Sequence, residues 1–159
     1  MAVPLGGERA VRRILVVANE TVAGIALRAE ILRRAQNHGV EVFVVCPALN
    51  SRIRRWFSDE DAARAAAQRR LDNSLASLSE VSILADGMVG DADPVQAIDD
   101  TLRFFRADEL IISTHPPGRS NWLEKGVVER ARSHSHVPIM HVIVDLERER
   151  ESLASVSAE

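Results

Sequence analysis

The sequence has little cysteine, no excess of basic over acidic residues and no long apolar run. Its 159 residues include one cysteine, Cys46, which excludes an internal disulfide framework. No pattern of cysteine and histidine has the spacing of a zinc site. The formal net charge is −3 and the arginines are scattered among acids, which disfavours nucleic-acid binding. We therefore expect a reducing compartment, no metal site and no nucleic-acid partner.

Segments for export or membrane insertion are also missing. The first residues, MAVPLGGERAVRR, contain no apolar core of a signal peptide, and the apolar run after Arg13 is too short to span a membrane. This pattern predicts a cytoplasmic protein without membrane contact.

Two common phosphate-binding motifs are absent as well. Neither G-x-x-x-x-G-K-[ST] nor G-x-G-x-x-G occurs, which disfavours a P-loop hydrolase and a dinucleotide oxidoreductase. No spacing of Ser, His and Asp or of paired carboxylates indicates a catalytic set. We predict no catalytic residues, and an enzyme ranks behind the binding functions described below.

The residues that are present predict one folded domain. Hydrophobic residues make up 46% of the chain and charged residues 27%, as in ordinary globular proteins. Apolar runs rich in β-branched residues predict five strands. These runs are Ile14–Ala18, Val40–Cys46, Val81–Val89, Leu110–Ser113 and Pro138–Val144. The first and fourth run do not alternate, which is typical of strands covered on both faces.

A helical pattern fills the first gap between strands. The helix is expected over Thr21–His38, with Thr21 as its N-cap and Gly39 as the glycine after its end. Its inner face is predicted from helical spacing and consists of Ile25, Ala29, Leu32 and Ala35.

Three more helices are predicted in the remaining gaps. The second begins near Ser58 and runs to about Ser79, with its inner face at Ala67, Leu71, Leu75 and Leu78. The third begins after the cap residue Asp93 at Pro94 and runs to about Phe105. The fourth begins near Asn121, with Val127 or Val128 and Ala131 facing inward.

The alternation of strand and helix predicts an α/β fold. The expected architecture is an open, five-stranded, mostly parallel sheet with helices on both faces. One domain is expected over residues 13–145, after a flexible N-terminal segment, residues 1–12. The charged tail, residues 146–159, is expected to be partly disordered, and a short helix is the alternative.

The stretch Ser113–Gly126, STHPPGRSNWLEKG, lies where such a sheet binds ligands. In parallel sheets, ligands bind beyond the carboxyl ends of the strands, where neighbouring connections leave in opposite directions. The stretch also leads into a helix N-terminus, where unpaired N–H groups favour an anion. The sequence therefore indicates an anion site here, unless these residues only turn the chain.

Four segments together resemble the universal stress protein (UspA-like) family. They are RILVVANET, GDADPVQAI, LIISTH and GVVERARSHSHVPIMHVIV, and the resemblance spans about Arg13 to Asp145. It implies a Rossmann-like, adenine nucleotide alpha hydrolase-like fold and a regulatory role in the stress response. It also implies a homodimer formed through the last strand and, in one branch of the family, ATP bound by a G-x2-G-x9-G-[ST] loop.

The loop of this chain matches that motif in length but only partly in residues. The first glycine falls on Ser113, the second on Pro116, the third on Gly126, and the closing hydroxyl residue on Val127. Consecutive prolines remove two backbone donors, and valine cannot donate from its side chain. Arginine, serine and asparagine within the loop could supply donors instead.

The resemblance and the strand ends together give the candidate nucleotide-binding residues. On the base and ribose side they are Asn19, Val45 and Gly90. Around the phosphates they are Ser113, His115, Arg119, Ser120, Asn121, Gly126 and Val127. The ligand would be ATP or AMP, with Mg²⁺ if it is ATP.

Simpler explanations stay open for several of these residues. Asn19 is also a good turn residue, Asp93 could serve only as a cap, and His115 could bond its own backbone. The arginines of residues 51–57, SRIRRWF, could form a partner-binding or phosphate-contacting flap, or their stems could simply lie over the neighbouring aromatics. His141 is expected to be a satisfied or interface histidine.

The alternative function is a protein-interaction module that binds no nucleotide. In that case the two prolines stiffen the loop into a surface for another protein. Either function is compatible with a homodimer formed by antiparallel pairing of Pro138–Val144, which would otherwise be an exposed sheet edge.

Overall fold

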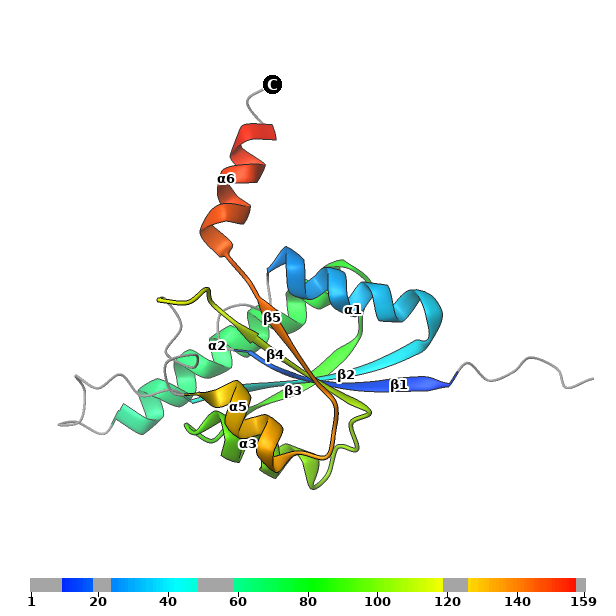
Figure 1. The fold of residues 1–159 in the computed structure, drawn as a ribbon. Helices are drawn as coiled ribbons and strands as arrows, with labels where there is room; N and C mark the ends of the chain where they lie inside the picture. Colours follow the sequence, from blue (N-terminus) through cyan, green and yellow to red (C-terminus); the bar gives the residue numbers. More distant parts are fainter. Residues whose placement is uncertain (1–9, 19–23, 49–58, 119–125, 157–159) are drawn as a thin grey trace, which may run out of the picture.

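The computed structural model describes residues 10–18, 24–48, 59–118 and 126–156. Five strands form one sheet in the order β3-β2-β1-β4-β5, and every neighbouring pair is parallel (Figure 1). The strands are β1 Val11–Val17, β2 Gly39–Pro47, β3 Ala85–Gly90, β4 Glu109–Thr114 and β5 Ile139–Ile143. The predicted α/β fold with a five-stranded parallel sheet is confirmed.

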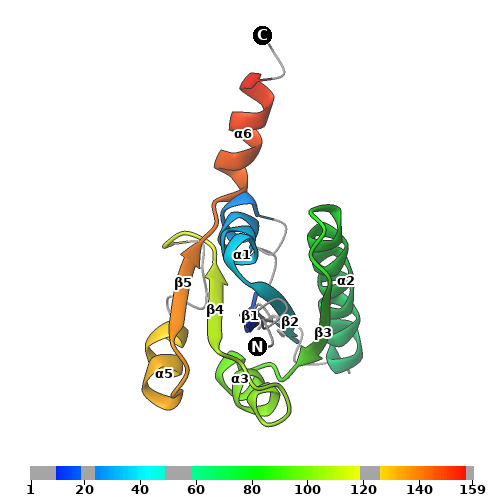
Figure 2. The ribbon, with the colours of Figure 1, turned by 90° about the vertical axis from the view of Figure 1, so that its right-hand side faces the viewer.

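Helices cover both faces of the sheet (Figure 2). They are α1 Ile25–Asn37, α2 Asp59–Glu80, α3 Pro94–Leu102 and α5 Val127–His134, whereas α6 Leu146–Val156 extends away from the sheet (Figures 1 and 2). Buried apolar residues of α1 and α2 pack on one face, and those of α3 and α5 pack on the other. Strand β4 and the second half of β1, from Ile14 to Val17, lie inside the sheet and are buried, which explains their continuous apolar runs.

Two strand starts differ from the prediction by more than one residue. Val11 and Arg12, expected in the flexible N-terminal segment, belong to β1. The third strand was expected from Val81 but begins at Ala85. Helix α2 continues to Glu80, and a turn follows it in which Ser82 has a φ of 63°. The residues that were expected to begin the strand therefore terminate the helix.

The inner face of α1 was mostly predicted wrongly, and of the four predicted residues Leu32 packs against the core. Its buried residues are Leu27, Ile31 and Arg34, whereas Ile25 is 45% exposed. Apolar residues occur on more than one side of this helix, so spacing alone selected the wrong face. The buried face could not be recognised from apolar spacing because it includes Arg34.

The predicted ends of α1 are also revised. The helix begins at Ile25 with Gly24 at the N-cap, and Thr21 lies outside the described residues. The C-cap is His38 in an extended conformation, and Gly39 is already the first residue of β2. Gly39 is therefore not the left-handed cap that was predicted.

The later helices follow the prediction more closely. Asp93 caps α3, since its Oδ1 accepts a hydrogen bond of 3.0 Å from the Val95 N–H. Helix α5 begins at Val127, later than expected, and the predicted start near Asn121 lies outside the described residues. Residues Leu146–Val156 of the tail form α6, which is the helical alternative.

Candidate functional site

The carboxyl ends of β1 and β4 lie side by side. Val17 pairs with Ile112, and the chain leaves β1 towards β2 but leaves β4 towards β5, on the opposite side. This is the topological switch point at which open α/β sheets bind ligands. We call the edge formed by the carboxyl ends of the five strands the carboxyl rim, with strand-end residues Val17, Pro47, Gly90, Thr114 and Ile143.

Ser113 is the predicted site residue with the most informative surroundings. It is 1% exposed, and its Oγ has no hydrogen-bond partner in the part of the chain that the structure describes. Side chains alternate along a strand, so Ser113 shares the face of Ile111, which packs in the core beneath α1 and α2. A buried hydroxyl without a partner costs about 1–3 kcal/mol, and this residue therefore calls for an explanation.

The next residue, Thr114, is satisfied by a neighbouring strand. Its Oγ1 lies 2.8 Å from Nε2 of His141 on β5. Burial lowers the pKa of His141, and the positive charge of Arg132 lowers it further. His141 is thus the satisfied histidine that was expected.

The phosphate-side residues are only partly within the described chain. His115 follows β4 and is partly exposed, while Arg119, Ser120 and Asn121 lie outside the described residues. Gly126 has a φ of 64° at the N-cap of α5, a left-handed conformation that favours glycine. The glycine that matches the family motif therefore occupies a position where its lack of a side chain matters.

Val127 is the first residue of α5 and is fully buried. Its side chain packs in the core on the α3 and α5 face. An apolar residue is suitable here because the side chain points into the core. Only its backbone could therefore contact a ligand.

Val45 and Gly90 lie at the carboxyl ends of neighbouring strands. The Val45 side chain is fully buried, and its carbonyl accepts a hydrogen bond of 3.3 Å from the Ala18 N–H. A Cβ on Gly90 would come within 2.7 Å of Val45 Cγ2 and 2.8 Å of the Ala97 Cβ. Close packing of β3 against α3 thus accounts for this glycine. Asn19, the third residue predicted on the base side, lies outside the described residues.

An ion pair joins α3 and α5 near the same rim. Arg130 donates to Asp93 Oδ2 over 3.1 Å, and both side chains are nearly half exposed. Asp93 also caps α3, so one carboxylate connects the starts of two helices.

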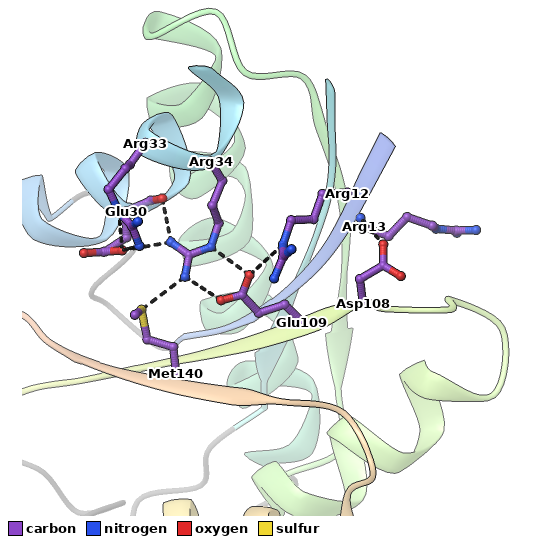
Figure 3. Close-up of polar contacts among 8 residues, drawn as sticks. All are labelled: Arg12, Arg13, Glu30, Arg33, Arg34, Asp108, Glu109 and Met140. Atoms are coloured by element: carbon purple, nitrogen blue, oxygen red, sulfur yellow. Dashed lines mark hydrogen bonds and ion pairs between the residues drawn. The ribbon is translucent and has the colours of Figure 1, made fainter. Parts of the chain in front are cut away.

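A buried ionic cluster lies at the amino ends of the strands, opposite the carboxyl rim (Figure 3). Arg34 from α1 and Glu109 from β4 form an ion pair in which each side chain is 8% exposed. Arg12 donates to the same carboxylate over 3.1 Å, and Arg34 also donates to Glu30 and to the Met140 sulfur. Sequence analysis missed this cluster, although an arginine inside an otherwise apolar helix face would have been its signal.

The charges of this cluster stabilise one another. The hydrogen bond from Arg34 holds the pKa of Glu109 below its ordinary value, and the same bond raises the pKa of Arg34. Hydrogen bonds from Arg34 and Arg33 also lower the pKa of Glu30. The cluster therefore stays ionised and is suited to a structural role.

The described residues contain neither an activated cysteine nor a cluster of metal ligands. Burial raises the pKa of the Cys46 thiol to about 11, as expected for a packed cysteine. Residues 10–18, 24–48, 59–118 and 126–156 contain no group of three or more metal-ligating side chains. Within the same ranges, no helix is long and apolar enough to cross a membrane.

Three solved structures with a similar fold are universal stress protein family structures. A family protein from Burkholderia pseudomallei is 18% identical with a TM-score of 0.57, covering 87% of this chain and 98% of that one. A universal stress protein from Archaeoglobus fulgidus is 17% identical with a TM-score of 0.57, covering 84% and 98%. A family protein from Arabidopsis thaliana, solved with AMP bound, is 13% identical with a TM-score of 0.59, covering 86% and 94%.

Sequence comparison adds no further relative. No protein-family model matches the chain, and no curated protein matches it. The resemblance that four sequence segments indicated is therefore supported by the three-dimensional fold. The chain has the fold of the universal stress protein family.

Proposed function

We propose that this chain is a universal stress protein-like regulatory protein that binds an adenine nucleotide at the carboxyl rim. The observation that carries the proposal is Ser113, whose buried hydroxyl lacks a partner among the described residues beside the switch point. A ligand oxygen at the rim would satisfy that hydroxyl. The AMP bound in the Arabidopsis thaliana structure of the same fold supports the choice of ligand.

The start of α5 fits the phosphate side of such a ligand. Gly126 exposes its backbone at the N-cap without a Cβ, and unpaired N–H groups of the first helical turn favour an anion. Asp93 and Arg130 hold the starts of α3 and α5 together at this position. AMP would require no metal, whereas ATP would bring Mg²⁺ held mainly by its phosphates and water.

Mass spectrometry of the denatured, purified protein tests this proposal. We expect AMP or ATP to be released, and we expect added AMP to raise the thermal midpoint of the protein. A Ser113→Ala variant should retain its fold and bind AMP more weakly, since one hydrogen bond is worth about 0.5–1.5 kcal/mol. Protein that carries no nucleotide and shows no thermal shift with AMP or ATP would contradict the proposal and favour the protein-interaction alternative.

We also propose that two copies of the chain pair through β5. This strand is a sheet edge, its five residues are free of Asp, Glu, Lys and Arg, and Ile143 is 48% exposed. The other edge strand, β3, carries the exposed charge of Asp86. Because charged residues block edge pairing, β5 is the edge that favours a partner strand.

The oligomeric state of two edge variants tests this pairing. Ile143→Lys should convert a dimer into a monomer in sedimentation velocity experiments. Leu84→Lys is the matched control, because Leu84 is 86% exposed and directly precedes the opposite edge strand. If the Leu84 variant dissociates and the Ile143 variant does not, the proposed interface is wrong.

A further inference from the structure

Strand β5 lies at the edge of the sheet and presents three residues to a partner strand (Figure 2). The Leu110 N–H donates to the Pro138 carbonyl, and the Val144 N–H donates to the Thr114 carbonyl, each over 2.9 Å. Because the backbone groups of successive strand residues point to opposite sides, the even-numbered residues from 138 to 144 face β4. The residues whose N–H and C=O groups point away from the sheet are therefore Ile139, His141 and Ile143.

A second copy of the chain can pair with all three of these residues. Antiparallel pairing about a two-fold axis at His141 places this residue opposite His141 of the partner subunit. The same axis places Ile139 of each copy opposite Ile143 of the other. Every outward-facing N–H and C=O group of β5 then has a partner.

Other positions of the axis leave some of these groups unpaired. An axis between two residues would oppose an outward-facing residue to an inward-facing one. Moving the axis by one whole residue would oppose an isoleucine to Val137 or to Asp145. The Val137 N–H already donates to Ser135 Oγ over 3.0 Å, and the Asp145 carbonyl already accepts from the Glu149 N–H over 3.0 Å. The axis at His141 is therefore favoured.

This register gives the interface an ionisable centre with apolar flanks. Ile139 packs against the core on the α3 and α5 face, and alternation places His141 and Ile143 on the same face. The pairing covers Ile143, which is 48% exposed in the single copy. It also brings the two His141 Cα atoms to about 5.5 Å, the spacing of a hydrogen-bonded antiparallel pair.

The groups that face His141 favour its neutral form. Burial lowers its pKa, the positive charge of Arg132 on α5 lowers it further, and the negative charge of Glu129 on α5 opposes this by a smaller amount. On β4, the uncharged Thr114 hydroxyl contacts Nε2 over 2.8 Å. A second imidazolium directly opposite would add a like charge, so pairing lowers the pKa of His141 again. The neutral ring is therefore the form that suits the dimer.

We propose that the paired β5 edges form a pH-sensitive interface, in which the two opposed His141 side chains separate the copies when both become charged. This inference rests on the proposed pairing through β5 and assigns a regulation to it. His141 binds a proton less readily in the dimer than in the monomer, where its pKa already lies below 6.5. The dimer is thus at full strength above this value and is lost as the pH falls through the lower pKa of the paired histidines.

Two cysteine variants of the full chain test the register. His141→Cys should form a disulfide-linked dimer under mild oxidation, since Cα atoms about 5.5 Å apart suit a disulfide. Ile143→Cys is the matched control, because its counterpart would lie four residues further along the partner strand, at least roughly 13 Å away. The native Cys46 is buried and is common to both variants. No cross-link through residue 141, or an equally fast one through residue 143, would overturn the register.

Sedimentation velocity at two pH values tests the switch. Between about pH 7.5 and about pH 5.5, the dissociation constant of the wild-type dimer should rise about fivefold or more, the effect of like charges directly opposite on neighbouring strands. His141→Gln keeps a polar side chain that cannot ionise, and its dimer should be equally strong at both values. His38→Gln, at the exposed C-cap of α1, should follow the wild type.

The outcomes separate the switch from the pairing on which it rests. A wild-type dimer of equal strength at both pH values, or one that weakens no more than that of His141→Gln, would overturn the switch and leave the pairing intact. A wild type that is monomeric at both pH values would instead overturn the proposed pairing through β5.

Discussion

Buried polar groups are paired differently at the amino ends and at the carboxyl ends of the strands. The edge formed by the amino ends of the strands, which we call the amino rim, contains the cluster of Arg34, Glu109 and their neighbours, where charges are mutually paired. The carboxyl rim contains a buried hydroxyl without a described partner and a helix start served by a residue from a distant helix. The amino rim is therefore suited to stability, and the carboxyl rim is suited to binding.

The largest loss of stability is expected from disrupting the buried ion pair of Arg34 and Glu109 at the amino rim. Glu109→Gln removes the buried carboxylate that pairs with the Arg34 guanidinium and leaves the partly exposed Glu30 as its remaining counter-ion, which should lower the free energy of unfolding by about 3 kcal/mol. Urea unfolding measures this loss. The double variant Arg34→Met with Glu109→Leu should recover most of it, because an apolar pair removes both buried charges.

Glu41→Gln is the matched control for this experiment. Glu41 pairs with Arg13 over 3.4 Å but is 54% exposed, so its loss should cost less than about 1 kcal/mol. Equal losses of unfolding free energy in the Glu41 and Glu109 variants would contradict this account, because the buried cluster would then stabilise the fold no more than an exposed ion pair does.

A smaller effect is expected from Gly90→Ala at the carboxyl rim. The new Cβ would come within 2.8 Å of both a Val45 methyl and the Ala97 Cβ, which should cost about 1–3 kcal/mol in unfolding experiments. Gly39→Ala is the control, because its nearest neighbour would lie 3.6 Å away, at ordinary contact. If both variants are equally stable, packing does not explain Gly90 and direct contact with a ligand becomes the better account.

The ion pair at the carboxyl rim should contribute less than the one at the amino rim. Arg130→Ala removes a partner of Asp93 in a pair of which both members are about 45% exposed, so we expect a loss of about 0.2–1 kcal/mol. Thermal and urea unfolding measure it. A loss as large as that of Glu109→Gln would contradict the contrast between the two rims.

The smallest effect at neutral pH is expected from His141→Gln. Burial lowers the folded-state pKa of His141 below its ordinary value of 6.5. The stability contributed by the neutral ring is thus complete above that value and is lost as the pH falls through the folded-state pKa. Between about pH 7.5 and about pH 5.5, the wild type should lose more stability than the variant. Parallel pH profiles would show that this histidine is not coupled to the fold.

The fold could be predicted from sequence because its determinants are local. Continuous apolar runs indicated the buried strands, and an aspartate followed by proline indicated the start of α3, where Asp93 accepts from the Val95 N–H. The late start of β3 was missed because the turn residue Ser82 adopts a φ of 63°, which its residue type does not announce.

The contacts of the two rims could not be predicted because they join distant residues. Arg34 and Glu109 are 75 positions apart, and an inward arginine is acceptable only once its carboxylate partner is known. Glu149 meets Ile25 across 124 positions, and nothing in the local sequence of either helix indicates it. Sequence located the strand ends, whereas the unpartnered hydroxyl of Ser113 and the contact of Glu149 with α1 became evident only from the packing.

The most direct test is a titration of the isotopically labelled protein with AMP, followed by backbone amide shifts in NMR spectra. Our account predicts that the largest shifts occur at Ser113, Gly126 and Val127, at the carboxyl rim, while Arg34 and Glu109 at the amino rim stay unchanged. Spectra that do not change on addition of AMP, or shifts that are largest around Glu109, would contradict it.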